Sequence, residues 1–138
     1  MKAWIQIFNY PAANGRIYTA KTKDEVFEFF NKPNGLLLTS QDQTTIAKKD
    51  FGIAEEKIIG KFENIDVVDT GDIGYNGYPI FEVYAEINDD SNLSEKFKPY
   101  KEMYENNIAT FGMRAIGTVS KDSVVTLERV ICFDMITK

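Results

Sequence analysis

The sequence contains no histidine and a single cysteine, Cys132. Without an imidazole the chain has no Ser-His or Cys-His nucleophile pair, no His-ligated zinc or haem and no histidine acid–base catalysis. One thiol also excludes an intramolecular disulfide framework and a cysteine-based zinc cluster. Any catalysis would therefore depend on carboxylates, lysine or tyrosine. Because Cys132 lies in an apolar stretch, we expect a buried and inert thiol.

Long apolar runs are also missing from the sequence. No stretch approaches the ~18 residues that a membrane-spanning helix needs, and the first ten residues lack the long apolar core of a signal peptide. We therefore expect no contact with a membrane, no secretion, and a protein that stays in the compartment where it is made. The 138 residues are enough for one globular domain, 1–138, with its own core.

Acidic side chains are concentrated in the middle third of the chain, and the net charge is −5. Residues 1–61 have 9 basic and 7 acidic side chains, residues 62–106 have 3 and 11, and residues 107–138 have 4 and 3. A face formed by residues 62–106 would repel phosphate, so we expect no nucleic-acid binding. Such a stretch is usually solvated surface, but it also suits a surface that binds a basic partner.

The spacing of apolar and turn residues predicts six strands and two helices. The strands are predicted at 3–8, 36–38, 57–68, 78–87, 110–119 and 124–136. The helices are predicted at 23–31, begun by a capping box at Thr22 and Glu25, and at 94–107, where Pro99 favours a late start or a kink. The glycine-rich residues 71–77 predict a hairpin loop, 88–92 a polar turn that caps the second helix, and 43–56 have no clear pattern. This order is typical of an α+β domain with a largely antiparallel sheet or small β-barrel and two or three flanking helices.

The triplet Asp69-Thr70-Gly71 resembles the core triplet of aspartic proteases. Their chemistry needs two carboxylates that share one proton, so a chain this short would supply one aspartate per subunit of a homodimer. Asp72 follows where those enzymes have a small residue, and a third carboxylate would add repulsion to an already crowded pair. The triplet also ends a predicted strand and enters the glycine-rich loop, where Asp-Thr-Gly is common turn chemistry.

Neither a metal nor a cofactor is expected. Asp66, Asp69 and Asp72 recur every third residue, whereas the ligands of an EF-hand calcium loop are two residues apart and are followed by a distant glutamate. The segment 71–77 lacks the lysine of a phosphate-binding loop and is acidic, so it does not suit a nucleotide.

The order of segments carries a family resemblance. A helix with the sequence KPYKEMYENN (98–107) leads into the strand FGMRAIG (111–117), and a final strand VICFD (130–134) follows. Upstream, NGRIY (14–18), a helix and GLLLTS (35–40) come in turn. This arrangement resembles the prohead maturation proteases of tailed bacteriophages, which share the herpesvirus assemblin fold. In that family the strand after such a helix carries the serine nucleophile in an apolar-Ser-x-Arg context, the opening segments end at the catalytic histidine, and the last strands supply an acidic residue.

The resemblance implies an inactive member of that family. It places Gly112 at the nucleophile, Arg114 at the nearby arginine, Ser40 near the histidine and Asp134 at the acidic residue. Glycine has no nucleophilic side chain, and the chain has no histidine that could activate one. The expected function is therefore a non-catalytic protein-binding module of a phage, acting as an inhibitor, a scaffold or a shell component. Its partner would be a capsid or core protein, bound by addition of an extended strand, in the host cytoplasm or the virion.

Two alternatives to this function stay open. The first is the homodimeric aspartic protease built around Asp69. The second is an acidic inhibitor or immunity-type protein of unrelated fold, which would bind a basic partner through residues 62–106. The sequence does not specify an oligomeric state.

Overall fold

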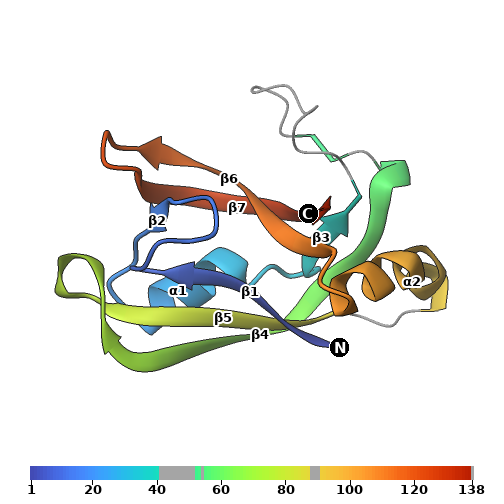
Figure 1. The fold of residues 1–138 in the computed structure, drawn as a ribbon, viewed down its shortest axis with the longest axis horizontal. Helices are drawn as coiled ribbons and strands as arrows, with labels where there is room; N and C mark the ends of the chain where they lie inside the picture. Colours follow the sequence, from blue (N-terminus) through green and yellow to red (C-terminus); the bar gives the residue numbers. More distant parts are fainter. Residues whose placement is uncertain (41–51, 54, 88–90, 138) are drawn as a thin grey trace.

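The computed structural model describes residues 1–40, 52–53, 55–87 and 91–137. These residues form a curled mixed sheet of seven strands with two α-helices, which confirms the predicted α+β class (Figure 1). The elements in chain order are β1 (Lys2–Phe8), β2 (Ile17–Tyr18), α1 (Lys23–Phe30), β3 (Leu36–Thr39), β4 (Ile58–Ile73), β5 (Pro79–Ile87), α2 (Ser91–Glu105), β6 (Ala109–Val119) and β7 (Val124–Thr137). Most of the unpatterned stretch 43–56 and of the turn predicted at 88–92 lies outside the described residues.

The strands are ordered β1-β5-β4-β3-β7-β2, and β6 pairs with the other side of β7. Neighbours are antiparallel except at two short parallel pairings, β2 with β7 and β3 with β7, so the sheet is largely antiparallel as predicted. The curl brings β1 towards β6, where Nε2 of Gln6 donates to the sulfur of Met113 over 3.7 Å. The sheet is therefore a half-barrel that a side-chain contact partly closes.

Helix α1 begins where the capping box predicts. The hydroxyl of Thr22 accepts a hydrogen bond from the backbone N–H of Glu25 at 3.2 Å. The carboxylate of Glu25 reaches back one residue further than the standard box and accepts from the N–H of Lys21 at 3.0 Å. The helix buries Val26 and Phe30 against the sheet, because these residues are four apart and share one face.

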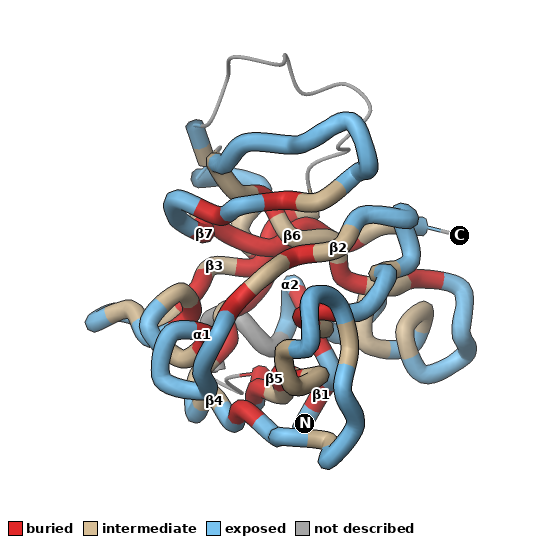
Figure 2. Tube along the Cα trace, turned by 90° about the vertical axis from the view of Figure 1, so that its left-hand side faces the viewer, coloured by how far each residue is buried: buried red, intermediate tan, exposed pale blue. Residues whose placement is uncertain are grey.

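Phenylalanine rings fill the concave side of the curled sheet. Phe62 on β4 meets Phe111 on β6 and Phe133 on β7 edge-on, each at a centroid distance of 5.2 Å. Phe8 and Phe30 make a similar contact at 5.9 Å. Figure 2 shows the buried positions along β3, β6 and β7 through the middle of the molecule. Burying one such ring stabilises the fold by about 1.5–3 kcal/mol, so these contacts hold the strands in their curl.

The structure corrects two predicted boundaries. Strand β4 continues through Ile73, so Gly71 lies inside a strand and not in a hairpin loop; the turn is limited to residues 74–78. A register shift between Asp69 and Ile73 and a φ of 83° at Gly71 show that a bulge absorbs the irregular residues within the pairing. Helix α2 begins at Ser91, three residues before the predicted start, and continues past Pro99.

Asn9, directly after β1, forms hydrogen bonds to three other segments of the chain. It is 1% exposed and has a φ of 65°, a left-handed conformation that asparagine tolerates. Its Nδ2 donates to the carbonyls of Ala20 at 2.8 Å and Pro79 at 2.7 Å, and its Oδ1 accepts from the N–H of Ala20 at 3.1 Å. Its own carbonyl accepts from the N–H of Tyr75 at 2.8 Å. One side chain thus fixes the starts of β5 and α1 relative to β1.

We predict that Asn9→Ala lowers the free energy of unfolding by about 2–4 kcal/mol, because two carbonyls and one N–H lose their partner in a buried place. Urea denaturation followed by circular dichroism measures the change. Asn34→Ala is the matched control: this side chain is exposed, and the expected change is within about 0.5 kcal/mol. An equal effect of the two substitutions would contradict the role of Asn9.

Candidate functional site

The strand pairing brings together three of the four positions that the family resemblance assigns to the site, Gly112, Arg114 and Asp134. On β7, Asp134 lies opposite Thr39 of β3 on one side and opposite Gly112 of β6 on the other. Arg114 is two residues further along β6, so its side chain leaves the same face of the strand as position 112. The hairpin of β6 and β7 and the sequence-distant strand β3 therefore meet at Asp134.

The side chains of Thr39, Arg114 and Asp134 form a buried hydrogen-bonded group, which we name the Asp134 cluster. Nε and Nη2 of Arg114 donate to Oδ2 and Oδ1 of Asp134 at 3.0 and 2.5 Å, a bidentate ion pair. The hydroxyl of Thr39 donates to Oδ1 of the same carboxylate. Nη1 of Arg114 donates to the carbonyl of Gly52 at 2.8 Å. Thr39 and Asp134 are 0% exposed and Arg114 is 8% exposed, so the cluster is part of the core.

Ser40 does not reach the cluster. It follows the last residue of β3, and its N–H donates to the carbonyl of Lys57 at 2.8 Å, while its hydroxyl contacts the same carbonyl. Successive side chains of an extended chain point to opposite sides, so the assignment by resemblance is one residue away from the group that contacts Asp134. The sequence analysis did not identify Thr39 as a site residue. The sign that could have identified it is its hydroxyl, which comes directly after the apolar residues 36–38 of a buried strand.

Cys132 is the buried thiol that the sequence predicts. It is 0% exposed, and burial together with the nearby carboxylate of Asp134 raises its pKa from 9.0 to about 12, although Arg114 acts in the opposite direction. A thiol with such a pKa stays protonated and unreactive near neutral pH.

The Asp-Thr-Gly triplet lies in the bulge of β4. Oδ1 of Asp69 accepts from the N–H of Gly71 at 2.9 Å, and the hydroxyl of Thr70 donates to the carbonyl of Ile80 at 2.9 Å. Asp69 is exposed. These bonds are turn chemistry, and they explain the triplet without a second carboxylate. The homodimeric aspartic protease stays a prediction.

Part of the acidic middle third, including Asp66, Glu82 and Glu86, lies on the paired strands β4 and β5. Asp66 pairs with Lys2 at 3.1 Å, and the hydroxyl of Tyr84 donates to Glu82 at 2.7 Å. This hydrogen bond is the main reason why the pKa of Tyr84 is raised above its usual value. Glu86 accepts from Asn64 at 2.7 Å. The carboxylates are therefore partly compensated by their neighbours, as on an ordinary solvated face.

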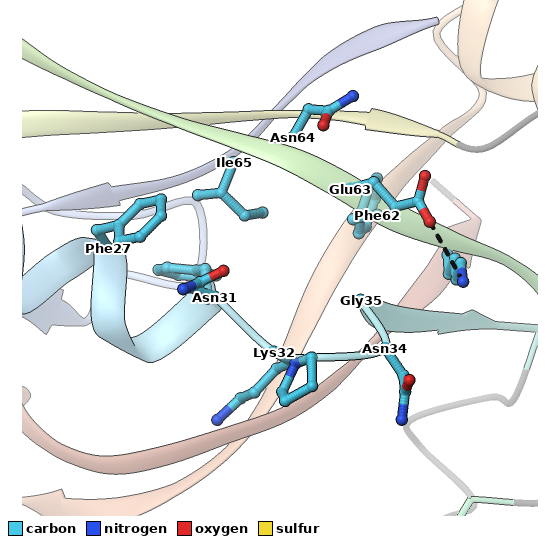
Figure 3. Close-up of a pocket in the computed structure, with 12 residues that line it drawn as sticks. Phe27, Asn31, Lys32, Asn34, Gly35, Phe62, Glu63, Asn64 and Ile65 are labelled. Carbon is cyan, nitrogen blue, oxygen red and sulfur yellow. Dashed lines mark ion pairs between the residues drawn. The ribbon is translucent and has the colours of Figure 1, made fainter.

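A pocket of about 390 Å³ lies between the end of α1 and β4 (Figure 3). Phe27, Phe62 and Ile65 supply apolar walls, and asparagines such as Asn31 stand at its rim. An ion pair between Lys61 and Glu63 at 3.2 Å closes one side. Apolar walls with a few hydrogen-bonding groups suit a small polar molecule. The residues that line this pocket do not include Ser40, Gly112, Arg114, Asp134 or the triplet Asp69-Thr70-Gly71.

Comparison of the chain with known protein families, with curated proteins and with solved structures finds no match. Within the described ranges, no group of three histidine, cysteine, aspartate or glutamate side chains could hold a metal ion. None of the described helices is long and apolar enough to cross a bilayer.

The Asp134 cluster predicts a non-additive mutant cycle. Asp134→Leu leaves the guanidinium of Arg114 buried without its anion, and we expect a loss of about 3–5 kcal/mol in the free energy of unfolding. The double variant Arg114→Met/Asp134→Leu replaces the pair with apolar groups, and we expect it to be more stable than Asp134→Leu alone. Urea denaturation of wild type, both single variants and the double variant checks this. Effects that simply add would contradict the pairing.

The thiol of Cys132 should be protected from alkylation. Because burial raises the pKa of Cys132 from 9.0 to about 12, the folded protein should contain far less thiolate near pH 8 than the unfolded chain. We expect iodoacetamide to modify the protein in denaturant and to leave the folded protein unmodified over the same time, as read by mass spectrometry. Rapid modification of the folded protein would show that the thiol is accessible.

Proposed function

We propose that this protein is a non-catalytic protein-binding module, related to the phage prohead proteases and acting in capsid assembly. The observation that supports this proposal is the burial and hydrogen bonding of Asp134. Both of its carboxylate oxygens accept hydrogen bonds from Arg114 or Thr39, and the residue is 0% exposed. Gly112 lies opposite this carboxylate, and the sequence has no histidine.

The chemistry of the cluster supports binding over hydrolysis. A general base must reach the proton that it removes, either directly or through one water. Asp134 is enclosed by β3, β6 and β7, and its lone pairs face the guanidinium of Arg114 and the hydroxyl of Thr39. The position opposite it has no side chain that could act as a nucleophile. The hydrogen bonds of the Asp134 cluster join β3, β6 and β7, which supports a structural use of this carboxylate.

The ends of the sheet supply surfaces for protein contact. In the described part of the chain, β1 pairs with β5 alone and β6 pairs with β7 alone, so each is an edge strand. An extended segment can add to such an edge through backbone hydrogen bonds, with no chemistry required. This mode of binding suits an inhibitor, a scaffold or a shell component, the roles that the family resemblance implies.

We predict no peptidase activity. Incubation of the purified protein with casein and with a mixture of fluorogenic peptides should give no cleavage above background, and Asp69→Asn should change nothing. Cleavage that disappears in Asp69→Asn would overturn the proposal in favour of the homodimeric aspartic protease.

Binding itself can be tested with displayed peptides of about ten residues selected on the folded protein. A selected peptide that adds as a strand should raise the melting temperature as its concentration rises, since a ligand of the folded state stabilises it. It should also slow hydrogen exchange at β1 or β6. Failure to select any peptide that protects an edge strand would count against strand addition.

The outer face of β4 and β5 favours a second candidate, an acidic protein that binds a basic partner. Asp66, Glu82 and Glu86 belong to neighbouring strands of this face. Binding of a lysine-rich peptide that falls steeply between low and high salt, with no protection of β1 or β6, would support this candidate over strand addition.

A further inference from the structure

The two edge strands differ in how they are protected against pairing. Register shifts place an extra residue, Ile5, within β1, so that edge is bulged. The Oε1 of Gln6 accepts from the backbone N–H of Ile7 at 2.9 Å, and Lys2 adds a charge. A bulge, a charge and an occupied N–H are devices by which proteins prevent edge strands from pairing with other chains.

Strand β6 has no bulge in its own backbone and no proline. The extra residues of its two register shifts, Ile131 and Glu128, belong to β7, so β6 itself is regular. Its one charged residue, Arg114, is directed inward to Asp134, and Gln6 of β1 contacts the strand at Met113. Beyond Arg114 the strand has no charged residue, and a regular, uncharged edge is a template for another strand.

The accessible part of this edge is its second half, Ala115–Val119. Gly117, Thr118 and Val119 are exposed, and Val119 is 49% exposed. The hairpin of β6 and β7 extends away from the helices, and β2 pairs with the opposite side of β7 at Ile17 and Val124 (Figure 1). Within the described residues, the outer side of β6 is therefore the side of this hairpin that remains for a new strand.

The distribution of charge favours a second copy of this chain as the strand that adds to β6. Residues 62–106 have 3 basic and 11 acidic side chains, so that region of one copy repels the same region of another. The hairpin 115–129 is balanced, with Lys121 and Arg129 against Asp122 and Glu128. It is thus a place where two acidic copies can approach without net repulsion. In a two-fold dimer the same strand meets itself antiparallel, and Ala-Ile-Gly-Thr-Val contains no charge that would oppose this.

We propose that the outer edge of β6 pairs with β6 of a second copy of this chain to form a homodimer with a continuous sheet. The inference rests on the proposed function, because it names the partner that strand addition would bind. Self-pairing also suits a scaffold or shell component, which must associate with copies of itself.

Analytical ultracentrifugation from about 1 μM to about 1 mM tests the dimer directly. We expect wild type to show a reversible dimer that added salt does not weaken, because no ion pair across the interface is required. Val119→Lys places a charge on the edge and should raise the dissociation constant about tenfold or more. Ile73→Lys is the matched control: its side chain is 67% exposed on the other hairpin, and the dissociation constant should not change. Circular dichroism verifies that both variants fold.

Cysteine cross-linking tests the geometry independently of affinity. Thr118→Cys should form a disulfide-linked dimer under mild oxidation, whereas Ile73→Cys should form far less. The native Cys132 should not interfere, because it is buried and its pKa is raised to about 12. Equal cross-linking at both positions would overturn the assignment of the interface to β6.

A wild-type protein that stays monomeric to about 1 mM, or a dimer that Val119→Lys leaves unchanged, would overturn the inference. These outcomes are separate from failure of the proposed function. If selected peptides protect an edge strand while the protein is monomeric, the binding function stands and self-pairing is wrong. If no peptide binds and no dimer forms, both proposals are wrong.

Discussion

The bidentate pair between Arg114 and Asp134 is the interaction on which the middle of the sheet depends. It joins β6 to β7, the hydroxyl of Thr39 adds β3, and the third guanidinium nitrogen donates to the carbonyl of Gly52. A buried pair of this kind adds little net stability compared with apolar residues, because both ions lose their hydration. What it adds is specificity. If β6 slipped by one residue, Arg114 would leave the cluster and a buried carboxylate would lose its partner.

The pairing of Arg114 with Asp134 also bears on whether this carboxylate has a catalytic or a structural role. An acidic residue that helps catalysis must orient a base or accept a proton, and it needs a route to substrate. Asp134 is buried, and both of its carboxylate oxygens accept hydrogen bonds from Arg114. This geometry is that of a structural ion pair, and the proposed function therefore assigns binding to the strand edges. The proposed self-pairing follows from this, because Arg114 turned inward leaves the outer side of β6 without charge.

The sequence predicted the strands and helices well where a local rule was strong. Thr22 and Glu25 located the start of α1 by their spacing, and the apolar residues of 57–68 and 124–136 gave strands that the structure contains. It failed where a tertiary contact overrides the local preference. Gly71 suggested a loop, yet β4 continues through it, because a bulge paired with β5 accommodates its positive φ. Gln6 gave no signal, since its contact with Met113 exists only after the sheet has curled.

The residue types alone establish the chemistry that this chain lacks: without histidine and with one cysteine, whole classes of catalysis are excluded whatever the fold. They also specify local structure, because capping, alternation and turn preferences act between residues close in the chain. The folded chain is needed to see that Thr39, and not Ser40, meets Asp134, and that among the described residues β1 is a bulged edge strand and β6 a regular one. Register and strand order depend on contacts between residues some twenty to a hundred positions apart, and no local pattern encodes which partner each strand will find.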